Sequence, residues 1–240
     1  MNTKIILNFL RDIAANNNRE WYLENKDKYD KAKKEFESGI NKMILNLSKF
    51  DTEISHLTAK DCIFRLNRDV RFSNDKSPYK RHFGAYIGGK GKKSLHGGYY
   101  IHLQPGNCFI ATGAYWLPTN ILTACRNEIM ANIDLWRKVV ENGKFVKYYG
   151  YPGEGKMEEY TDNGKMSPKG FGMSHLKKAP KDFPSDYQFI DYLKMKDYAC
   201  WHCVDDDFFE DEGWVDKTME LFKTAKPMMD MMNAVIDDYE

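Results

Sequence analysis

The chain begins with two stretches in which apolar side chains recur every three or four residues, the spacing of one helix face. In residues 3–15 these positions are Ile5, Ile6, Phe9, Leu10 and Ile13. Asn16–Asn18 follow and predict a helix end and a cap for the next helix, because asparagine is a preferred capping residue. The same spacing from Arg19 to about Lys49, with Lys and Glu on the outer face, predicts one long amphipathic helix.

After Asp51 the pattern changes to short runs of β-branched and aromatic residues, which are typical of strands. Four such strands are predicted, at residues 63–67, 82–87, 98–103 and 108–114. Residues 104–107 have the composition of a hairpin turn. No segment of helix length separates the last three strands, so we expect an antiparallel meander.

The C-terminal half alternates between helical and extended patterns. Pro118 is expected to open a helix, and a final helix from Asp211 or Glu212 onward is expected to kink or break at Pro227. Between them we expect a strand at 144–149, a long ordered loop or irregular hairpin at 150–181, a short helix from Ser185 or Asp186 to Leu193, and a strand at 198–204. The predicted fold is a single α+β domain, residues 1–240, in which an antiparallel β-meander packs against N-terminal and C-terminal helices.

Composition excludes some classes of protein. The net charge is only +1, with 36 basic and 35 acidic residues among 240, which argues against a general nucleic-acid or membrane coat. The apolar run near the N-terminus is too short and too polar for a signal peptide, and no stretch approaches the roughly 20 apolar residues of a membrane span. Five cysteines, an odd number, then predict reduced thiols and a cytoplasmic protein.

One short segment, Arg65 to Gly84, carries most of the candidate chemistry. Its six arginines and lysines stand against two aspartates, which leaves an excess of four positive charges. A cluster of arginines suits an anion, because each guanidinium presents a planar fork of donors that matches phosphate or carboxylate oxygens. The segment is therefore either a ligand site or a salt-bridged loop.

In the first interpretation, the segment binds a small ligand that carries a phosphate or a carboxylate. The ligand-binding candidates are Arg65, Arg68, Arg71, Ser73, Lys76 and Lys80. The catalytic candidates are Asp69 and Asp75, either of which would orient an arginine or accept a proton, and Tyr79, which would donate a hydrogen bond. In the second interpretation, the arginines and aspartates bond to one another and hold an irregular loop against the core. The sequence favours neither.

Two further cations are ligand-binding candidates. Lys169 lies in the predicted loop, where Gly170 permits a close approach of the backbone, although a solvated lysine in a turn is the alternative. Arg126 lies between Leu122 and Ile129 on the apolar side of a predicted helix, so we expect it to point inward. Because a buried arginine is usually paired, an Asp or Glu partner is favoured over a ligand.

The arginine-rich segment also carries a family resemblance. Residues 65–80 are similar to the signature R-x-N-R-D-x-R-F-S-x-D-K-x-P-Y-K of a family of conserved hypothetical proteins of bacteria and fungi, a domain of unknown function. Similar positions elsewhere are Phe9-Leu10, Asn16-Asn17, Glu20-Trp21-Tyr22, Tyr99-Tyr100, Gly113, Tyr115, Arg126 and Pro168 to Phe171. The resemblance covers nearly the whole chain and implies no established activity, substrate or cofactor.

The remaining motifs carry little chemistry. Cys200 and Cys203 have the spacing of redox and zinc pairs, but a strand would place them on opposite faces, and no second ligand pair is evident. We therefore expect no metal, and the cofactor stays unknown. The sequence as a whole predicts a member of a family of unknown function that binds a small anionic ligand, with a hydrolase as the commonest enzyme class to consider. The alternatives are a nucleic-acid-associated protein, which the neutral net charge disfavours, and a structural or interaction protein with no small ligand.

Overall fold

The computed structural model describes residues 1–71, 73–155 and 164–240, so Phe72 of the arginine-rich segment and residues 156–163 of the predicted loop lie outside the described residues. Five antiparallel strands form one sheet in the spatial order β1-β2-β3-β5-β4. The strands are β1 (Phe83–Ile87), β2 (Gly98–Leu103), β3 (Cys108–Ala114), β4 (Lys169–Phe171) and β5 (Tyr198–Val204). The predicted α+β class with an antiparallel sheet is confirmed.

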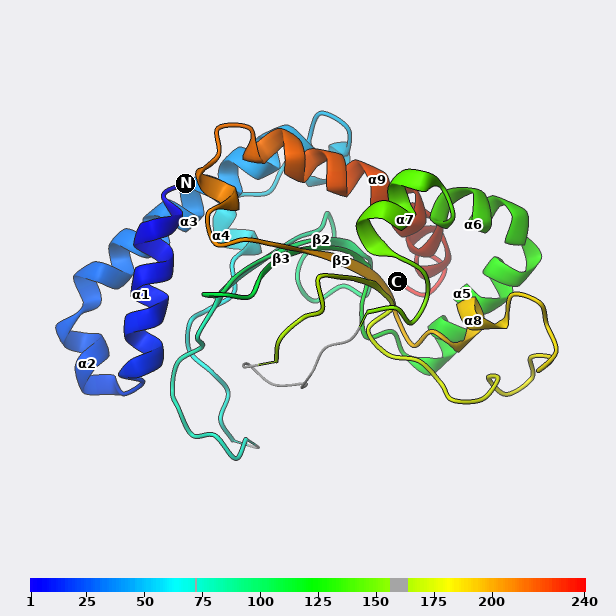
Figure 1. The fold of residues 1–240 in the computed structure, drawn as a ribbon, viewed down its shortest axis with the longest axis horizontal. Coiled ribbons are helices and arrows are strands. Elements are labelled where there is room, and N and C mark those ends of the chain that lie inside the picture. Colours follow the sequence, from blue (N-terminus) through cyan, green and yellow to red (C-terminus); the bar gives the residue numbers. More distant parts are fainter. Residues whose placement is uncertain (72, 156–163) are drawn as a thin grey trace.

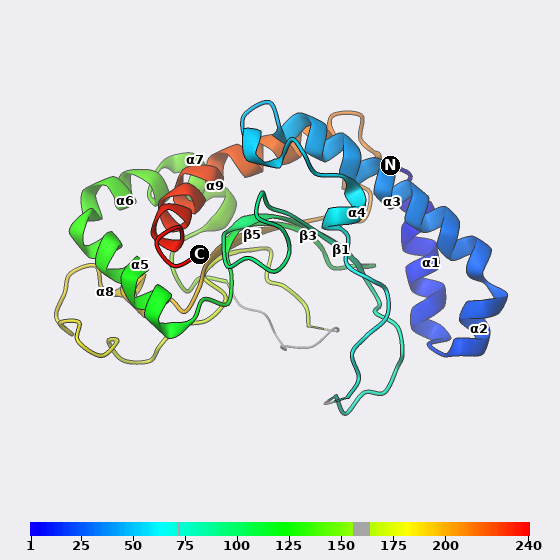
Figure 2. The ribbon, with the colours of Figure 1, turned by 180° about the vertical axis from the view of Figure 1, so that it is seen from behind.

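The helices arch over one face of this sheet and flank its two ends, and loops border the other face (Figure 1, Figure 2). They are α1 (Thr3–Ala15), α2 (Arg19–Glu24), α3 (Lys26–Leu47), α4 (Ala59–Cys62), α5 (Thr119–Ala131), α6 (Ile133–Val140), α7 (Gly143–Tyr149), α8 (Ile190–Lys194) and α9 (Trp214–Ile236), with single 3-10 turns at Thr52–Ile54 and Phe208–Glu210. None of the helices described here has both the length and the apolar character needed to cross a bilayer.

The core lies between the sheet and the helices α3 and α9. The Tyr99 ring packs on Phe222 of α9 with 4.8 Å between ring centroids, and Phe83 packs on Phe36 of α3 at 5.4 Å. All four rings are at most 6% exposed. Since side chains alternate along a strand, every second residue of β1 and β2 faces these helices, and the residues between them face the other way.

The clearest alternating and helical patterns in the sequence predicted the first and last residues of their strands and helix correctly. The strands predicted at 98–103, 108–114 and 198–204 and the helix predicted at 3–15 are confirmed to the residue, and β1 begins one residue later than predicted. The turn at 104–107 closes with a hydrogen bond from the Asn107 N–H to the Gln104 carbonyl (2.9 Å), and Gly106 takes a φ of 71° that glycine adopts readily.

Two predictions are wrong because of single asparagine residues, and the final helix does not break at Pro227. The predicted long helix is interrupted at Asn25, which ends α2 and begins α3. The predicted strand at 144–149 is the helix α7, because the Asn142 side chain accepts hydrogen bonds from the N–H groups of Lys144 and Phe145. Helix α9 is continuous through Pro227, where buried residues on both sides keep it packed on the sheet.

Two other predictions differ from the structure. The short helix predicted from Ser185 or Asp186 begins at Ile190, because the preceding residues form two successive turns, closed by bonds from Tyr187 N–H to the Pro184 carbonyl and from Ile190 N–H to the Tyr187 carbonyl. Residues 63–67 form isolated bridges instead of a strand, because the chain leaves the sheet after Ile63 pairs with Ala85.

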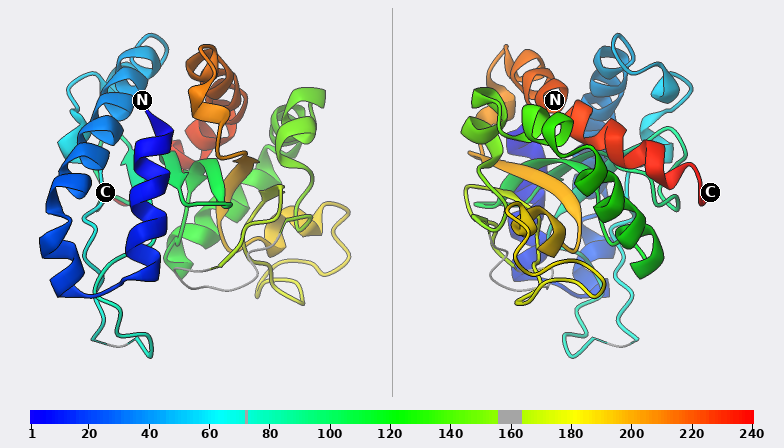
Figure 3. Two further views of the ribbon diagram at one scale, coloured as in Figure 1. Left: turned by 60° about the vertical axis from the view of Figure 1, so that its left-hand side comes forward. Right: turned by 90° about the vertical axis from the view of Figure 1, so that its right-hand side faces the viewer.

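From that point the chain makes the arginine hairpin, which we define as residues 65–71 and 73–81. It projects away from the sheet on the side opposite α3 and α9 (Figure 1, Figure 3). Its two arms are joined by hydrogen bonds from Lys80 N–H to the Leu66 carbonyl (2.8 Å) and from Arg68 N–H to the Pro78 carbonyl (2.9 Å). The hairpin is therefore an ordered extension of the sheet edge.

Tyr79 docks the arginine hairpin onto the N-terminal helices. Its backbone N–H donates to Asn17 Oδ1 (3.0 Å), and its carbonyl accepts from Asn17 Nδ2 (2.9 Å). Its ring, 5% exposed, stacks on Tyr22 of α2 with 4.5 Å between centroids. One amide side chain thus satisfies both backbone groups of the residue that anchors the hairpin.

We expect Asn17→Ala to lower the free energy of unfolding by about 1–3 kcal/mol, because two partly buried backbone groups of Tyr79 lose their partners. Urea denaturation followed by circular dichroism measures this change. Asn16→Ala is the matched control, since among the described residues the Asn16 side chain bonds within its own helix end, to the Asp12 carbonyl. Equal destabilisation by the two variants would contradict the docking role of Asn17.

Candidate functional site

Two arginines of the arginine hairpin are hydrogen-bonded to its own aspartates, and a third, Arg81, forms a longer ion pair with Asp75, at 3.9 Å from Nη2 to Oδ2. Arg68, whose side chain is 11% exposed, places Nη1 2.7 Å from Asp75 Oδ2 and also donates to the Ser77 carbonyl and the Ser73 hydroxyl. Arg71 is 76% exposed and forms a bidentate pair with Asp69, at 2.9 Å from Nε to Oδ1 and 2.7 Å from Nη2 to Oδ2. The structure thus places these predicted residues in two groups, Arg68 with Asp75 and Ser73, and Arg71 with Asp69.

These contacts set the protonation of both aspartates. The hydrogen bonds from Arg71 hold the pKa of Asp69 at about 2, and those from Ser77, followed by Arg68, hold the pKa of Asp75 at about 2. A carboxylate with so low a pKa is a poor proton acceptor at neutral pH. In this conformation the two predicted bases are therefore charge partners within the hairpin.

The other predicted residues are spread over several elements. Lys76 Nζ donates to the Val70 carbonyl (3.0 Å), and Arg65 is exposed, with no hydrogen bond to the described part of the chain. Tyr79 is buried, as described above. Lys169 lies on β4, and its Nζ donates to the carbonyls of Val146 (3.0 Å) and Lys147 (3.1 Å) at the end of α7, where a cation is favourable.

Arg126 points inward from α5 as predicted, but its expected acidic partner is not found among the described residues. The residue is 5% exposed, and its Nη2 donates to the Met195 carbonyl (2.9 Å). Arg126 and Lys169 therefore do not join the arginine hairpin in one pocket. Of the predicted ligand-binding residues, Lys80 is the one that lines a cavity at the base of the hairpin.

This sheet cavity, of about 460 Å³, lies on the sheet face that the helices leave uncovered. Its floor consists of four small residues on three adjacent strands: Gly98, Ala111, Gly113 and Ala199. Its walls are aromatic: Phe64, Tyr86, Tyr100, Phe109, Tyr115 and Trp201. A Cβ at Gly98 would come within about 2.7 Å of the Tyr86 ring, so glycine there lets the ring lie against β2.

The charged residues of the sheet cavity are cations. Lys80 and Lys92 lie near its Phe64 wall, with their Nζ atoms 5.4 Å and 5.7 Å from the Phe64 ring centroid, and Lys92 Nζ also donates to the Ile63 carbonyl (2.9 Å). No aspartate or glutamate is among the described residues that line the cavity. The cavity therefore combines a positive rim with flat apolar walls.

Two stacked imidazoles lie beside the cavity. His82 stacks on His102 at 4.3 Å between centroids, and His102 stacks on Phe109 at 4.5 Å. Burial lowers the pKa of His102 to about 4 and the pKa of His82 well below its usual value, so both rings are neutral at neutral pH. The His82 Nδ1 atom is buried and has no hydrogen-bond partner among the described residues.

The hydrogen bonds of His102 assign its tautomer. Its Nε2 lies 3.0 Å from Gln104 Oε1, which also accepts from Asn107 Nδ2, so Nε2 carries the proton. Its Nδ1, 3.0 Å from the Tyr100 hydroxyl, then accepts the Tyr100 proton. The Tyr86 hydroxyl likewise donates its proton, to the His96 carbonyl (2.5 Å). Of the tyrosines that line the cavity, Tyr86 and Tyr100 therefore have their hydroxyl protons committed to protein acceptors.

The sequence analysis did not identify His82, Tyr86, Tyr100 or His102 as site residues. A usable signal was present, because Tyr99 and Ile101 are apolar and alternate with Tyr100 and His102 along one predicted strand. Once helices cover the apolar set, the polar aromatic set must lie on the opposite face. What the sequence did not show was that loops, and no second helical layer, border that face.

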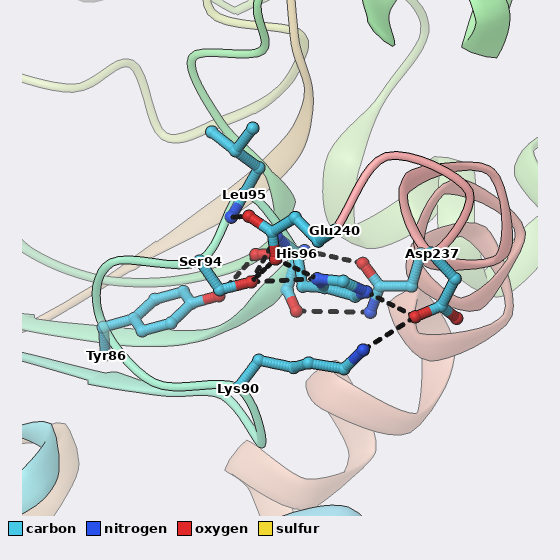
Figure 4. Close-up of polar contacts among 9 residues, drawn as sticks. Tyr86, Lys90, Ser94, Leu95, His96, Asp237 and Glu240 are labelled. Atoms are coloured by element: carbon cyan, nitrogen blue, oxygen red, sulfur yellow. Dashed lines mark hydrogen bonds and ion pairs between the residues drawn. The ribbon is translucent and has the colours of Figure 1, made fainter.

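Another wall of the cavity, which carries Ser94 and His96, is held by the α9 clasp, which we define as residues 94–96 with Asp237 and Glu240 (Figure 4). His96 is nearly buried, with Nε2 2.9 Å from Asp237 Oδ1 and Nδ1 3.0 Å from Glu240 Oε2. Glu240 also accepts from the Ser94 hydroxyl (2.6 Å) and from the Leu95 N–H (2.7 Å). Residues just beyond α9 thus position a wall of the cavity.

The described residues show no cluster of three or more His, Cys, Asp or Glu side chains that could hold a metal ion. Cys200 and Cys203 lie on β5 as predicted, and both are free thiols.

Comparison with known proteins adds a family. The model of the family of conserved hypothetical proteins DUF2461 matches residues 5–231, a span that includes the arginine hairpin and the sheet cavity and ends before Asp237 and Glu240. No curated protein and no solved structure gives a significant match to the chain.

We expect Arg68→Met to lower the melting temperature more than Arg71→Met does. Arg68 is nearly buried and holds Asp75, Ser73 and the Ser77 carbonyl together, whereas Arg71 forms an exposed pair that water can replace. Differential scanning calorimetry of the two variants measures the contrast. Equal melting temperatures would show that the Arg68 contacts do not organise the hairpin.

The α9 clasp should make stability depend on pH. Hydrogen bonds lower the pKa of Asp237, chiefly from Lys90 and then His96, and the pKa of Glu240, chiefly from Ser94. A lowered carboxyl pKa stabilises the fold at neutral pH, and this stabilisation is lost as the pH falls through the lowered value. A D237N/E240Q double variant should therefore have a lower melting temperature than the unmodified protein at pH 7, and the two melting temperatures should become similar near pH 3.

The control is Asp230→Asn, which removes an exposed pair with Lys226 on the same helix. It should change the melting temperature little at either pH, because an exposed pair of this spacing contributes little. A melting difference for D237N/E240Q that is as large at pH 3 as at pH 7 would contradict the assignment.

Proposed function

This chain belongs to the DUF2461 family of conserved hypothetical proteins, and we propose that it binds a small anionic ligand with a flat apolar body in the sheet cavity. The observation that carries the proposal is the composition of that cavity. Two lysines and six aromatic residues line it, and no carboxylate is among its described lining residues. Pockets of this size, apolar with a few placed polar groups, are typical of small-molecule sites.

The walls and the rim would hold different parts of the ligand. An aromatic or other planar group would lie against the rings of Phe109, Tyr100 and Trp201, above a floor that has no large side chain. The anionic group then lies near Lys80 and Lys92, where the apolar surroundings strengthen its attraction to the ammonium groups. A phosphate or a carboxylate on a planar body meets both requirements.

The arginine hairpin supports this site in two ways. Its internal pairs, Arg68 with Asp75 and Arg71 with Asp69, stiffen the arms whose lower end carries Lys80. Its excess positive charge, to which Arg65 and Lys76 contribute, attracts an approaching anion. In the proposal, the hairpin arginines position Lys80 and attract the anionic ligand, while the sheet cavity binds it.

The proposal assigns binding and no reaction step. Asp69 and Asp75 are held as charge partners with pKa values of about 2, and Tyr79 is stacked on Tyr22 in the core. Hydrolysis by these three residues would require the hairpin to rearrange. The assay below includes a phosphate ester, so that turnover is detected if it occurs.

We expect isothermal titration calorimetry to show binding of adenosine monophosphate and 4-nitrophenyl phosphate, and weaker binding of adenosine and inorganic phosphate. A K80Q/K92Q double variant should bind both aromatic phosphates at least about tenfold more weakly, the loss expected for one or two charge-assisted contacts. Arg71→Gln is the matched control, because it removes a hairpin cation outside the cavity, and it should stay within about threefold of the unmodified protein.

Unchanged affinity in K80Q/K92Q, or no binding of either aromatic phosphate, would reject the sheet cavity as the site. A larger loss in Arg71→Gln than in K80Q/K92Q would place the anion in the hairpin instead. Tighter binding of a single-stranded oligonucleotide, with an affinity that falls steeply with salt, would support the nucleic-acid alternative.

A further inference from the structure

A second cavity, which we call the α5 cavity, has a volume of about 790 Å³ and is not used by the proposed function. Arg126 and Leu122 of α5 form part of its lining, and Trp116 and Leu117 approach it from the segment after β3. Its polar lining also includes four residues of the long connection between β4 and β5: Lys181, Asp182, Lys196 and Asp197.

Arg126 is a buried charge without a counter-charge. The residue is 5% exposed, its Nη2 donates to the neutral Met195 carbonyl, and its Nε has no hydrogen-bond partner among the described residues. The Tyr198 hydroxyl adds a second neutral contact. Burying a guanidinium is costly unless an anion pairs with it, so the arrangement is incomplete as it stands.

Asp197, which lines the same cavity, does not supply the missing charge. Its carboxylate oxygens accept from the backbone N–H groups of Met173 (3.0 and 3.1 Å), Ser174 (3.2 Å) and Ala199 (3.4 Å). Burial raises the pKa of Asp197 to about 6, whereas a partner arginine would lower it. The two groups therefore share a cavity without forming an ion pair.

The backbone around the α5 cavity is strained at two places. Trp116 has a φ of 61° and Asp182 a φ of 70°, and these are the non-glycine residues with positive φ in the described ranges. Both line this cavity. Strained residues of this kind gather at binding sites, where the surrounding structure holds them in place for contact with a ligand.

We propose that the α5 cavity binds an organic monocarboxylate. Its carboxylate pairs with the guanidinium of Arg126, whose planar fork matches two carboxylate oxygens, and its apolar body lies against Leu117, Leu122 and Leu176. A single negative charge suffices, because Arg126 is the buried cation among the described residues of the lining. Lys181 and Lys196 are exposed and attract the anion at the entrance.

The test uses phenylacetate, its neutral analogue phenylacetamide, and inorganic phosphate, each titrated into the full chain by calorimetry. Phenylacetate should bind and raise the melting temperature, and the other two should not. Arg126→Met should weaken phenylacetate binding about tenfold to a hundredfold, the loss expected for one charge-assisted hydrogen-bonded pair. Without ligand this variant should melt at or above the temperature of the unmodified protein, because an unpaired buried charge is removed.

Two further variants make the outcome decisive. K80Q/K92Q, which alters the sheet cavity, should bind phenylacetate normally, so failure of one site is distinguishable from failure of the other. Leu176→Trp narrows the α5 cavity without touching Arg126, and it should weaken binding even if Arg126→Met does not fold. Equal binding of phenylacetamide, normal binding by Leu176→Trp, or a lowered melting temperature of ligand-free Arg126→Met would overturn the proposal.

Discussion

Burial of one sheet face against α3 and α9 is the constraint on which the rest of the structure depends. The contacts of Tyr99 with Phe222 and of Phe83 with Phe36 fix which side of each strand faces the core. Because strands alternate, the same contacts direct Tyr86 toward the uncovered face. The aromatic walls of the sheet cavity are therefore a consequence of core packing, and a change in strand register would exchange the two sets of side chains.

The second determinant is whether a charge is matched within the protein. Arg68 and Arg71 looked like the strongest ligand candidates in the sequence, yet each has an aspartate as a partner within seven residues. Arg126 was expected to be paired with an acid, yet its contacts with the described residues are to the neutral oxygens of Met195 and Tyr198. Cation density along a sequence is thus a poor guide to binding, and the decisive quantity is the charge that stays uncompensated after folding.

These cases show what the sequence could and could not predict. Strands β2, β3 and β5 were predicted to the residue, because each has a clear period of two or a clear turn beside it. The helix α7 was missed because the pattern at 144–149 fits a strand. The Asn142 side chain, which caps the first turn, favours the helix instead. The partners of Arg126 and Lys169 lie 69 and 22 or 23 residues away along the chain, and no local pattern carries such information.

The short segment after β3 links the two cavities. Gly113, at a φ of 122°, lets β3 approach β5 so closely that a Cβ there would lie 2.1 Å from the Tyr198 carbonyl oxygen. Tyr115, two residues later, lines both cavities, and Trp116 then takes its strained conformation beside the α5 cavity. A larger residue at Gly113 would push β3 away from β5. This shift would displace the floor of the sheet cavity and the lining of the α5 cavity that follows β3. The two proposed sites therefore depend on the same segment of backbone, but they offer a ligand different cations: Lys80 and Lys92 in the sheet cavity, and Arg126 in the α5 cavity.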